Sequence, residues 1–142
     1  MSDTRDDRAR VQEAMERAVR AAGATTSLFE HRPTEDGRGW VLDWEGTVDG
    51  ETADLSVIGY GGDLPVQFFV DAWLLEGVAK SDIPAVIAAT LGGGGARIVT
   101  SGRLFWKGAE LLVPLPGGEL TSSVRNPSDA SPAPWEQRAA GN

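Results

Sequence analysis

The sequence predicts an α+β fold, with an N-terminal helix and one internal helix packed on a mainly antiparallel sheet of about seven strands, in the order α-β-β-β-β-α-β-β-β. Two observations support this class. Apolar residues recur at helical spacing in two segments, and most of the remaining first 116 residues alternates with a period of two between short turn sequences. Because two helices are too few to supply parallel crossovers, the strands are expected to pair as antiparallel neighbours.

The first predicted helix spans 4–22. Thr4 can cap its N-terminus, Asp7 occupies the capping-box position, and Gly23 ends the pattern. Its apolar positions form a thin, alanine-rich stripe of Val11, Met15, Ala18 and Ala22. Such a helix is expected to pack closely against a sheet while its charged faces stay solvated.

A short strand over 25–31 precedes the strongest local signal in the chain, a hairpin around Asp49-Gly50. This dipeptide favours a two-residue type I′ turn, and the resulting register sets Glu45 opposite Asp54. One face of the hairpin is apolar and predicted to be core: Trp40, Leu42, Trp44, Val48, Leu55 and Val57. The other face is polar: Asp43, Glu45, Thr47, Thr52, Asp54 and Ser56. Like charges directly opposite each other destabilise a strand pair, so this arrangement predicts either strong solvation or a functional benefit.

The segment 66–75 is predicted to be a single strand, and large apolar side chains then fall on both of its faces. Two interpretations remain open. Either a second layer covers the outer face and both aromatic residues are core, or Phe69 and Trp73 are exposed beside Asp71.

A short, mostly buried helix is predicted over 81–91, with Ser81 or Asp82 as its cap and Pro84 in its first turn. Four glycines follow at 92–95. A phosphate-binding loop places glycines before a helix, where backbone N–H groups and the helix dipole attract an anion. These glycines follow a helix instead, so they are interpreted as a C-terminal cap and hinge.

A three-stranded meander is predicted over 96–115, with turns at the X-Gly dipeptides 101–102 and 107–108. Prolines are expected to end it. The domain is predicted to cover 1–116, and the Pro-, Ser- and Gly-rich segment 117–142 is expected to be a disordered tail. Trp135 stands out in this tail, either as an anchor for a partner or as a side chain that folds back on the domain.

Composition narrows the function classes. The 142 residues include no cysteine, which excludes disulfides, thiolate nucleophiles and cysteine-bound metals and favours a reducing compartment, so the cytoplasm is the expected location. The N-terminus has no apolar signal region, and neither secretion by such a signal nor a membrane span is expected. Nine acidic residues and one base, Lys80, lie between Val41 and Asp82, so this segment carries the whole net charge of −8. Such a field repels nucleic acid and anionic lipid and attracts basic proteins or cations.

Catalysis has one candidate arrangement, the hairpin carboxylates Asp43, Glu45 and Asp54, which could bind a hard divalent cation or share protons in acid–base chemistry. Their spacing does not resemble the D-x-D-x-D-G calcium-binding loop. The only histidine, His31, has no serine context around it that indicates a hydrolytic triad. A metal-dependent or acid–base enzyme is therefore the alternative hypothesis, and no cofactor is predicted.

The preferred hypothesis is a non-enzymatic, protein-binding domain with a basic protein as its partner. Aromatic residues are enriched at interface centres, and acidic surroundings speed association with basic proteins. The predicted partner-binding residues are Asp43, Glu45, Asp54, Phe69, Asp71 and Trp73. The element order over about the first 115 residues is similar in layout to small bacterial secretion-chaperone-like domains, and the acidity is similar to that of immunity proteins that neutralise basic toxins. These likenesses imply an immunity, chaperone or adaptor role and transfer no functional residue. The Ala-, Gly-, Arg- and Asp-rich composition resembles that of proteins from high-GC bacteria or their phages.

Overall fold

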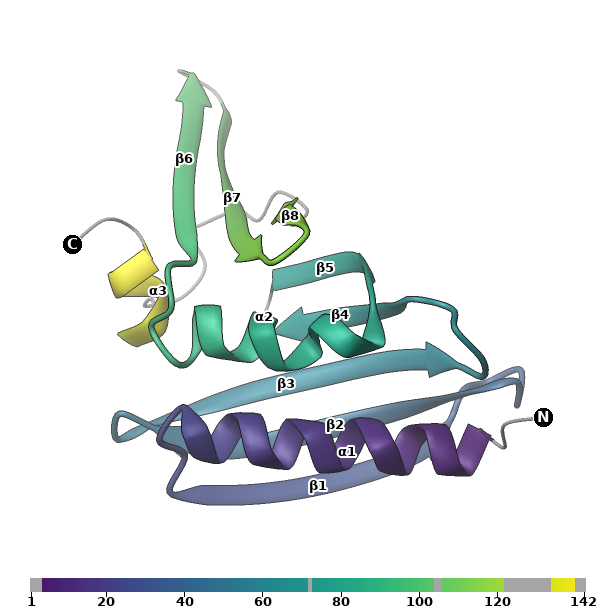
Figure 1. Ribbon diagram of the computed structural model, residues 1–142. Coiled ribbons are helices and arrows are strands. Elements are labelled where there is room, and N and C mark those ends of the chain that lie inside the picture. Colours follow the sequence, from purple (N-terminus) through teal and green to yellow (C-terminus); the bar gives the residue numbers. More distant parts are fainter. Residues whose placement is uncertain (1–3, 72, 104–105, 122–133, 140–142) are drawn as a thin grey trace.

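The computed structural model describes residues 4–71, 73–103, 106–121 and 134–139 and confirms the α+β class (Figure 1). The helical elements are α1 (Thr4–Ala21), the 3-10 turn η1 (Lys80–Asp82), α2 (Ile83–Thr90) and α3 (Pro134–Ala139). Within these residues the strands are β1 (Thr26–Pro33), β2 (Gly39–Val48), β3 (Glu51–Tyr60), β4 (Val66–Val70), β5 (Trp73–Val78), β6 (Arg97–Arg103), β7 (Trp106–Leu115) and β8 (Gly118–Thr121). Eight strands thus form, where about seven were expected.

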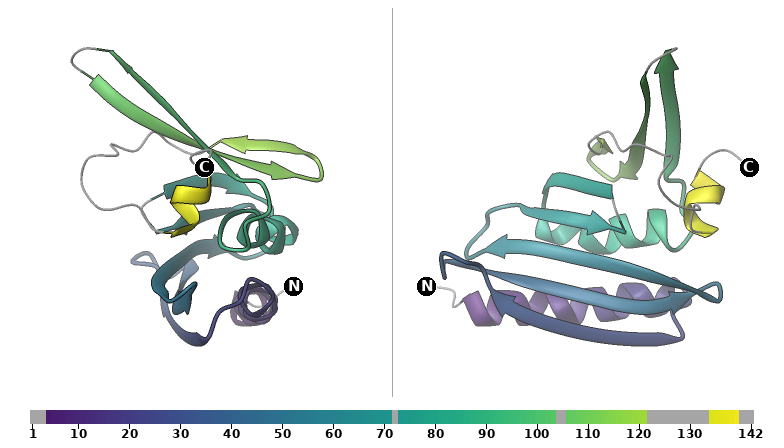
Figure 2. Two further views of the ribbon diagram at one scale, coloured as in Figure 1. Left: turned by 90° about the vertical axis from the view of Figure 1, so that its left-hand side faces the viewer. Right: turned by 180° about the vertical axis from the view of Figure 1, so that it is seen from behind.

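The strands divide into two antiparallel sheets. The larger sheet has the order β1-β2-β3-β4-β5, so each strand pairs with its neighbour in the chain, and the smaller sheet has the order β6-β7-β8. Helices α1 and α2 contact each other and lie on one face of the larger sheet (Figure 1). The view from behind shows the opposite face of β1, β2 and β3 without a helix over it (Figure 2). We call this opposite face of the larger sheet the outer face.

The β2–β3 hairpin has the predicted turn and register. Asp49 and Gly50 both have positive φ, 55° and 78°, as a type I′ turn requires. Val48 pairs with Glu51, and Glu45 pairs with Asp54. The six residues of the predicted apolar face are all buried, at 5% exposure or less. The period-two pattern therefore identified the core face of this hairpin correctly.

The segment predicted as one strand over 66–75 is two strands, and this prediction is wrong. The chain reverses after Val70, where Asp71 has a φ of 50°, and Val70 then pairs with Trp73. Because the reversal exchanges the alternation, Trp73 lies on the same face as Phe68 and Val70. Its side chain is only 2% exposed. Of the two interpretations of Trp73, the structure shows the one in which it is core, so its prediction as a partner-binding residue is wrong. The turn explains why one predicted strand seemed to be apolar on both faces.

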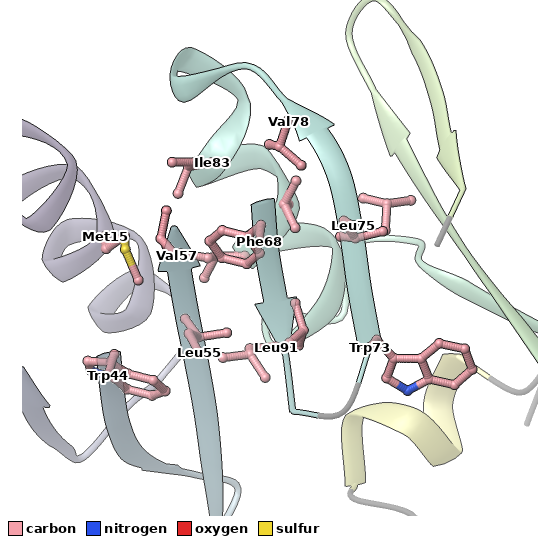
Figure 3. Close-up of a cluster of buried hydrophobic side chains, with 14 of the residues drawn as sticks. Met15, Trp44, Leu55, Val57, Phe68, Trp73, Leu75, Val78, Ile83 and Leu91 are labelled. Carbon is pink, nitrogen blue, oxygen red and sulfur yellow. The ribbon is translucent and has the colours of Figure 1, made fainter. Parts of the chain in front are cut away.

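The core lies between the larger sheet and its two helices. Figure 3 shows side chains from α1, α2 and strands β2–β5 projecting into one cluster, with Trp73 at the end near α3. Met15, Phe68, Ile83 and Leu75 have no exposed surface. Burial on this scale stabilises the fold by about 25 cal/mol for each Å² of apolar surface removed from water. None of the helices in the described part of the chain is long and apolar enough to span a bilayer.

A lysine joins the N-terminal helix to the far end of the sheet. Lys80 Nζ lies 2.7 Å from Asp7 Oδ2 and donates to the carbonyl oxygens of Tyr60 at 2.9 Å and Gly62 at 2.6 Å. Asp7 Oδ2 also accepts the indole N–H of Trp40 at 3.2 Å. Asp7 therefore works here as a tertiary contact between α1, β2 and η1. We call this group the Lys80 junction.

The four glycines after α2 end the helix as predicted. The N–H groups of Gly92, Gly93 and Gly94 donate to the carbonyls of the last helical turns, at 3.1, 3.2 and 2.9 Å. Gly93 and Gly95 have φ of 71° and 102°, in the region that favours glycine. This segment is a C-terminal cap with carbonyl groups facing it, so it offers no anion cradle.

The smaller sheet differs from the predicted meander. Ser101 pairs with Gly108 and Gly102 pairs with Lys107, so both predicted turns lie inside the paired strands β6 and β7. An X-Gly dipeptide between apolar runs is thus an insufficient turn signal, because a long ladder can run through glycine. The prolines do not end the sheet either, since Pro114 pairs with Glu119 of β8.

Two parts of the segment 117–142 belong to this fold. Strand β8 pairs with β7, and α3 docks beside the β4–β5 turn. Trp135 is 3% exposed, and its indole N–H donates to Asp71 Oδ2 at 2.7 Å. In return, the indole of Trp73 donates to Glu136 Oε2 at 3.2 Å. Of the two interpretations of Trp135, the structure shows the one in which it folds back on its own domain. Residues 122–133 of the predicted tail lie outside the described residues.

Candidate functional site

The outer face of the larger sheet gathers most of the predicted site. Antiparallel pairing alternates side chains, so Leu28 and Glu30 of β1, Asp43 and Glu45 of β2, and Asp54 and Ser56 of β3 all project to this face. Phe69 of β4 pairs with Ser56 and extends the row. We call the surface formed by Leu28, Glu30, Asp43, Glu45, Asp54, Ser56 and Phe69 the acidic sheet surface.

A hollow lies within this surface. It encloses about 260 Å³ and is lined by Leu28, Glu30, Asp43, Trp44, Glu45, Asp54, Leu55 and Ser56. Leu28 is 61% exposed, which is high for a large apolar side chain. An apolar side chain at the rim and carboxylates around it are suited to the stem and head of a long basic side chain.

The three hairpin carboxylates differ in how far they are already paired. Asp43 forms an ion pair with Arg32, and it accepts the hydroxyl of Ser56 at 2.6 Å. Glu45 and Asp54 face each other across the strand pair and are both exposed. Of the three hairpin carboxylates, Glu45 and Asp54 therefore carry the charge that no ion pair among the described residues neutralises, and Glu30 of β1 adds a further negative charge to the surface.

The pKa of Asp54 is raised above its ordinary value of 3.8. The largest cause is desolvation of the carboxylate by the protein atoms around it, although its side chain is exposed, followed by the negative charges of Asp71, Glu45 and Asp43. The protein thus holds Asp54 where its ionised form is disfavoured. A cation placed at this point would relieve the repulsion, because an opposite charge favours the ionised carboxylate.

Two of the predicted partner-binding residues have structural roles. Asp71 accepts the backbone N–H of Asp54 at 2.9 Å through one oxygen and the indole of Trp135 through the other. It holds the β4–β5 turn, and Trp73 is in the core. Phe69 is half-buried, pairs with Ser56 and lies at the rim of the acidic sheet surface.

Sequence reasoning missed Leu28 and Glu30. The period-two pattern of 25–31 places both side chains on one face of a strand, but the strand's register against β2 decides that they stand beside Glu45 and Asp43. That register is set across the 34–38 loop, whose sequence carries no hairpin signal as specific as Asp49-Gly50. The adjacency therefore required the structure.

The metal hypothesis gains no support from this geometry. Among the residues that the structure describes, no group of three or more histidine, aspartate or glutamate side chains is arranged to hold a metal ion. Calcium needs six to eight oxygens at 2.3–2.6 Å, and Asp43 and Asp71 already direct their oxygens to protein donors.

Comparison with protein-family models, with curated proteins and with solved structures finds no match to this chain.

Proposed function

We propose that this chain is a small protein-binding domain whose acidic sheet surface binds a basic segment of another protein. The observation that carries the proposal is the hollow beside the exposed Leu28, which is ringed by carboxylates on a sheet face that neither α1 nor α2 covers (Figure 2). A lysine or arginine side chain fits such a site, with its stem on the leucine and its charge between Glu45 and Asp54.

Repulsion between carboxylates of the acidic sheet surface favours the binding of a positively charged group. Glu45 and Asp54 oppose each other in the free protein, and this arrangement costs stability that a Thr pair would not cost. A bound cation turns the repulsion into attraction and therefore contributes to binding without a new fold element. The net charge of −8 also speeds the encounter with a basic partner.

The biological role that we infer is of the immunity, chaperone or adaptor type, in the cytoplasm of a high-GC bacterium or in its phage. Each of these roles uses a compact domain to hold a charged partner, and none requires catalysis. Acidic immunity proteins neutralise basic toxins, which is the pairing that the charge of this surface favours.

The experiment compares two charge-matched double variants in affinity capture from the native host followed by mass spectrometry. Glu45→Gln with Asp54→Asn removes two charges from the surface. Glu35→Gln with Asp63→Asn removes two exposed charges from loops outside it. For a basic protein captured by the parent, we expect the surface variant to bind at least about tenfold more weakly, equivalent to about 1.4 kcal/mol, and the loop variant to bind like the parent.

Salt provides the second readout. The affinity of the parent should fall as salt rises, and the surface variant should show a shallower dependence. Equal affinities for both variants across the salt range would show that the acidic sheet surface serves solubility only, and the proposal would then be wrong.

A further inference from the structure

Strand β1 leaves one long edge of the larger sheet open. It spans eight residues and pairs only with β2 among the described strands. Seven of its eight residues are exposed, and Phe29 is half-buried. An edge of this length is a template for pairing with another strand, because its outward N–H and C=O groups have no partner within the sheet.

The register identifies the backbone groups that face outward. The N–H of Thr34 donates to the carbonyl of Gly39, and the β1–β2 register continues from this pair. In an antiparallel ladder every second residue bonds to a given neighbour, so Leu28, Glu30 and Arg32 bond to β2. The backbone groups of Ser27, Phe29 and His31 therefore point away from the sheet, and Pro33 ends the row because it has no N–H.

A groove runs beside this edge on the helix side. It encloses about 630 Å³ between α1 and β1, and its lining includes Arg8, Gln12, Glu16, Ser27 and Phe29. A strand added to β1 would place alternate side chains in this groove. The half-buried Phe29 would be the apolar contact at its centre.

We propose that β1 of a second copy of this chain adds antiparallel to β1, with the two Phe29 residues facing each other across a two-fold axis. This register pairs Ser27 with His31 of the second copy, so all outward N–H and C=O groups of the three residues are used. An axis at Glu30 would set two glutamates opposite each other, and an axis at His31 would oppose Phe29 to Pro33, which lacks a donor.

The charges along the groove fit the same two-fold axis. The Ser27 hydroxyl donates to Glu16 at 2.6 Å, which places Glu16 over Ser27. Arg8 precedes Glu16 by eight residues, or about 12 Å of helix, which corresponds to between three and four strand residues. Because α1 runs opposite to β1 (Figure 1), Arg8 is expected about three to four strand residues beyond Ser27, in the direction of His31. Pairing Ser27 with His31 of the second copy therefore directs Arg8 of that copy toward Glu16, which already forms an ion pair with Arg20 of its own helix.

Salt separates this association from the proposed binding function. Each copy carries a net charge of −8, so screening should strengthen the pairing of two copies, whereas it should weaken the binding of a basic partner. Leu28 and Glu30 belong to the acidic sheet surface and would also pair across this edge. The two proposals are therefore separated by residues that belong to one of them only, which are Phe29 for the pairing of two copies and Glu45 and Asp54 for the binding of a basic partner.

The first experiment measures the mass of the full chain by sedimentation equilibrium over a range of concentrations, in low and in moderate salt. We expect twice the monomer mass at high concentration. Phe29→Lys should remain monomeric while its circular dichroism stays that of the parent. The matched control is Leu64→Lys, which places the same charge at another exposed apolar residue, 58% exposed, and should still dimerise.

The second experiment tests the register through single cysteines, which the natural sequence lacks. Leu28 and Glu30 of the second copy would form a non-hydrogen-bonded pair, with Cα atoms about 4.5 Å apart, a separation that a disulfide accepts. A mixture of Leu28→Cys and Glu30→Cys should therefore cross-link several times faster than either variant alone. A parent that stays monomeric throughout, a dimeric Phe29→Lys variant, or equal cross-linking rates would overturn the proposal.

Discussion

The larger sheet and the C-terminal helix α3 reach burial by different routes. In the sheet, every strand pairs with its neighbour in the chain, so each contact closes a short loop. Helix α3 has six residues, too few to be stable alone in water, and its contacts are with residues distant in the sequence. The bond from Trp135 to Asp71 joins residues 64 positions apart.

This difference shows what a short segment needs in order to join a fold. The turn residues of a hairpin and the alternation of its apolar and polar residues determine its structure locally. Helix α3 carries one large side chain that fits a site formed by other elements, and the carboxylate of Glu136 accepts a hydrogen bond from the indole of Trp73. Each of these two hydrogen bonds joins an indole N–H to a carboxylate oxygen. The docking of α3 therefore satisfies four buried or half-buried polar groups at once, two indoles and two carboxylates.

The largest expected effect on stability comes from removing the long-range contacts of α3. Trp135→Ala should lower the free energy of unfolding by about 3 kcal/mol, at the low end for a buried tryptophan, because the freed helix regains conformational entropy. Urea denaturation of the full chain measures it. Trp135→Phe keeps most of the apolar area and should lose only about 1 kcal/mol with the hydrogen bond to Asp71.

The composition of 117–142 alone predicts that its removal leaves the melting temperature almost unchanged. The buried Trp135 predicts a clear fall instead. A variant lacking 134–142 that melts with the parent would show that α3 contributes nothing to stability in solution.

A smaller effect on stability is expected from disrupting the local turn of the β2–β3 hairpin. Gly50→Val should destabilise the domain by about 2 kcal/mol, because a β-branched residue resists the φ of 78° at this position. Nothing lies within 4 Å of an added Cβ at Gly50, so the effect is one of backbone conformation without a clash. Gly50→Asn is the control, since asparagine tolerates this region, and it should be nearly neutral. Similar losses for both variants in urea denaturation would contradict this account.

The smallest effect on stability is expected from removing the two opposed carboxylates of the β2–β3 hairpin. Replacing Glu45 and Asp54 with Thr should raise stability by about 0.5–1 kcal/mol at neutral pH, because the opposed charges are removed and threonine suits a strand. The pKa of Asp54 is raised in the folded protein, so the folded state binds its proton more tightly than the unfolded chain does. The penalty of ionised Asp54 is therefore full above the folded pKa and disappears as the pH falls below 3.8.

Thermal or urea denaturation of parent and variant between pH 3 and pH 7 measures this difference. The gain in the variant should shrink steadily toward acid pH. A gain that stays constant with pH would assign the effect to strand propensity and would remove electrostatic strain from the description of the acidic sheet surface.

Local signals predicted the parts of the fold that local chemistry decides. Asp49-Gly50 fixed the β2–β3 turn and the opposition of Glu45 and Asp54, and Gly23 and the glycines 92–95 marked two helix ends. The turn after Val70 was missed because Asp71 is not a glycine, and its positive φ is supported by bonds to Asp54 and Trp135, which are distant in the sequence.

The residues of the candidate site also divide into those that local sequence placed correctly and those that depend on contacts distant in the sequence. Asp43, Glu45 and Asp54 were placed together by one hairpin and its alternation. Leu28 and Glu30 joined them through the pairing of β1, for which the sequence has no specific turn signal. Trp73 was misplaced because one undetected reversal exchanges every later side chain between the two faces of the sheet.

The Lys80 junction has a consequence for the chemistry of its amine. A lysine ammonium has three N–H donors, and Lys80 has three oxygen acceptors, one on Asp7 and two on the backbone of Tyr60 and Gly62. An acylating reagent must displace these three acceptors, so Lys80 should be acylated more slowly than a fully exposed lysine. Because one acceptor belongs to helix α1 and the other two lie at or just after the end of β3, the acylation rate of this lysine reports how often the contacts between these elements open while the protein stays folded.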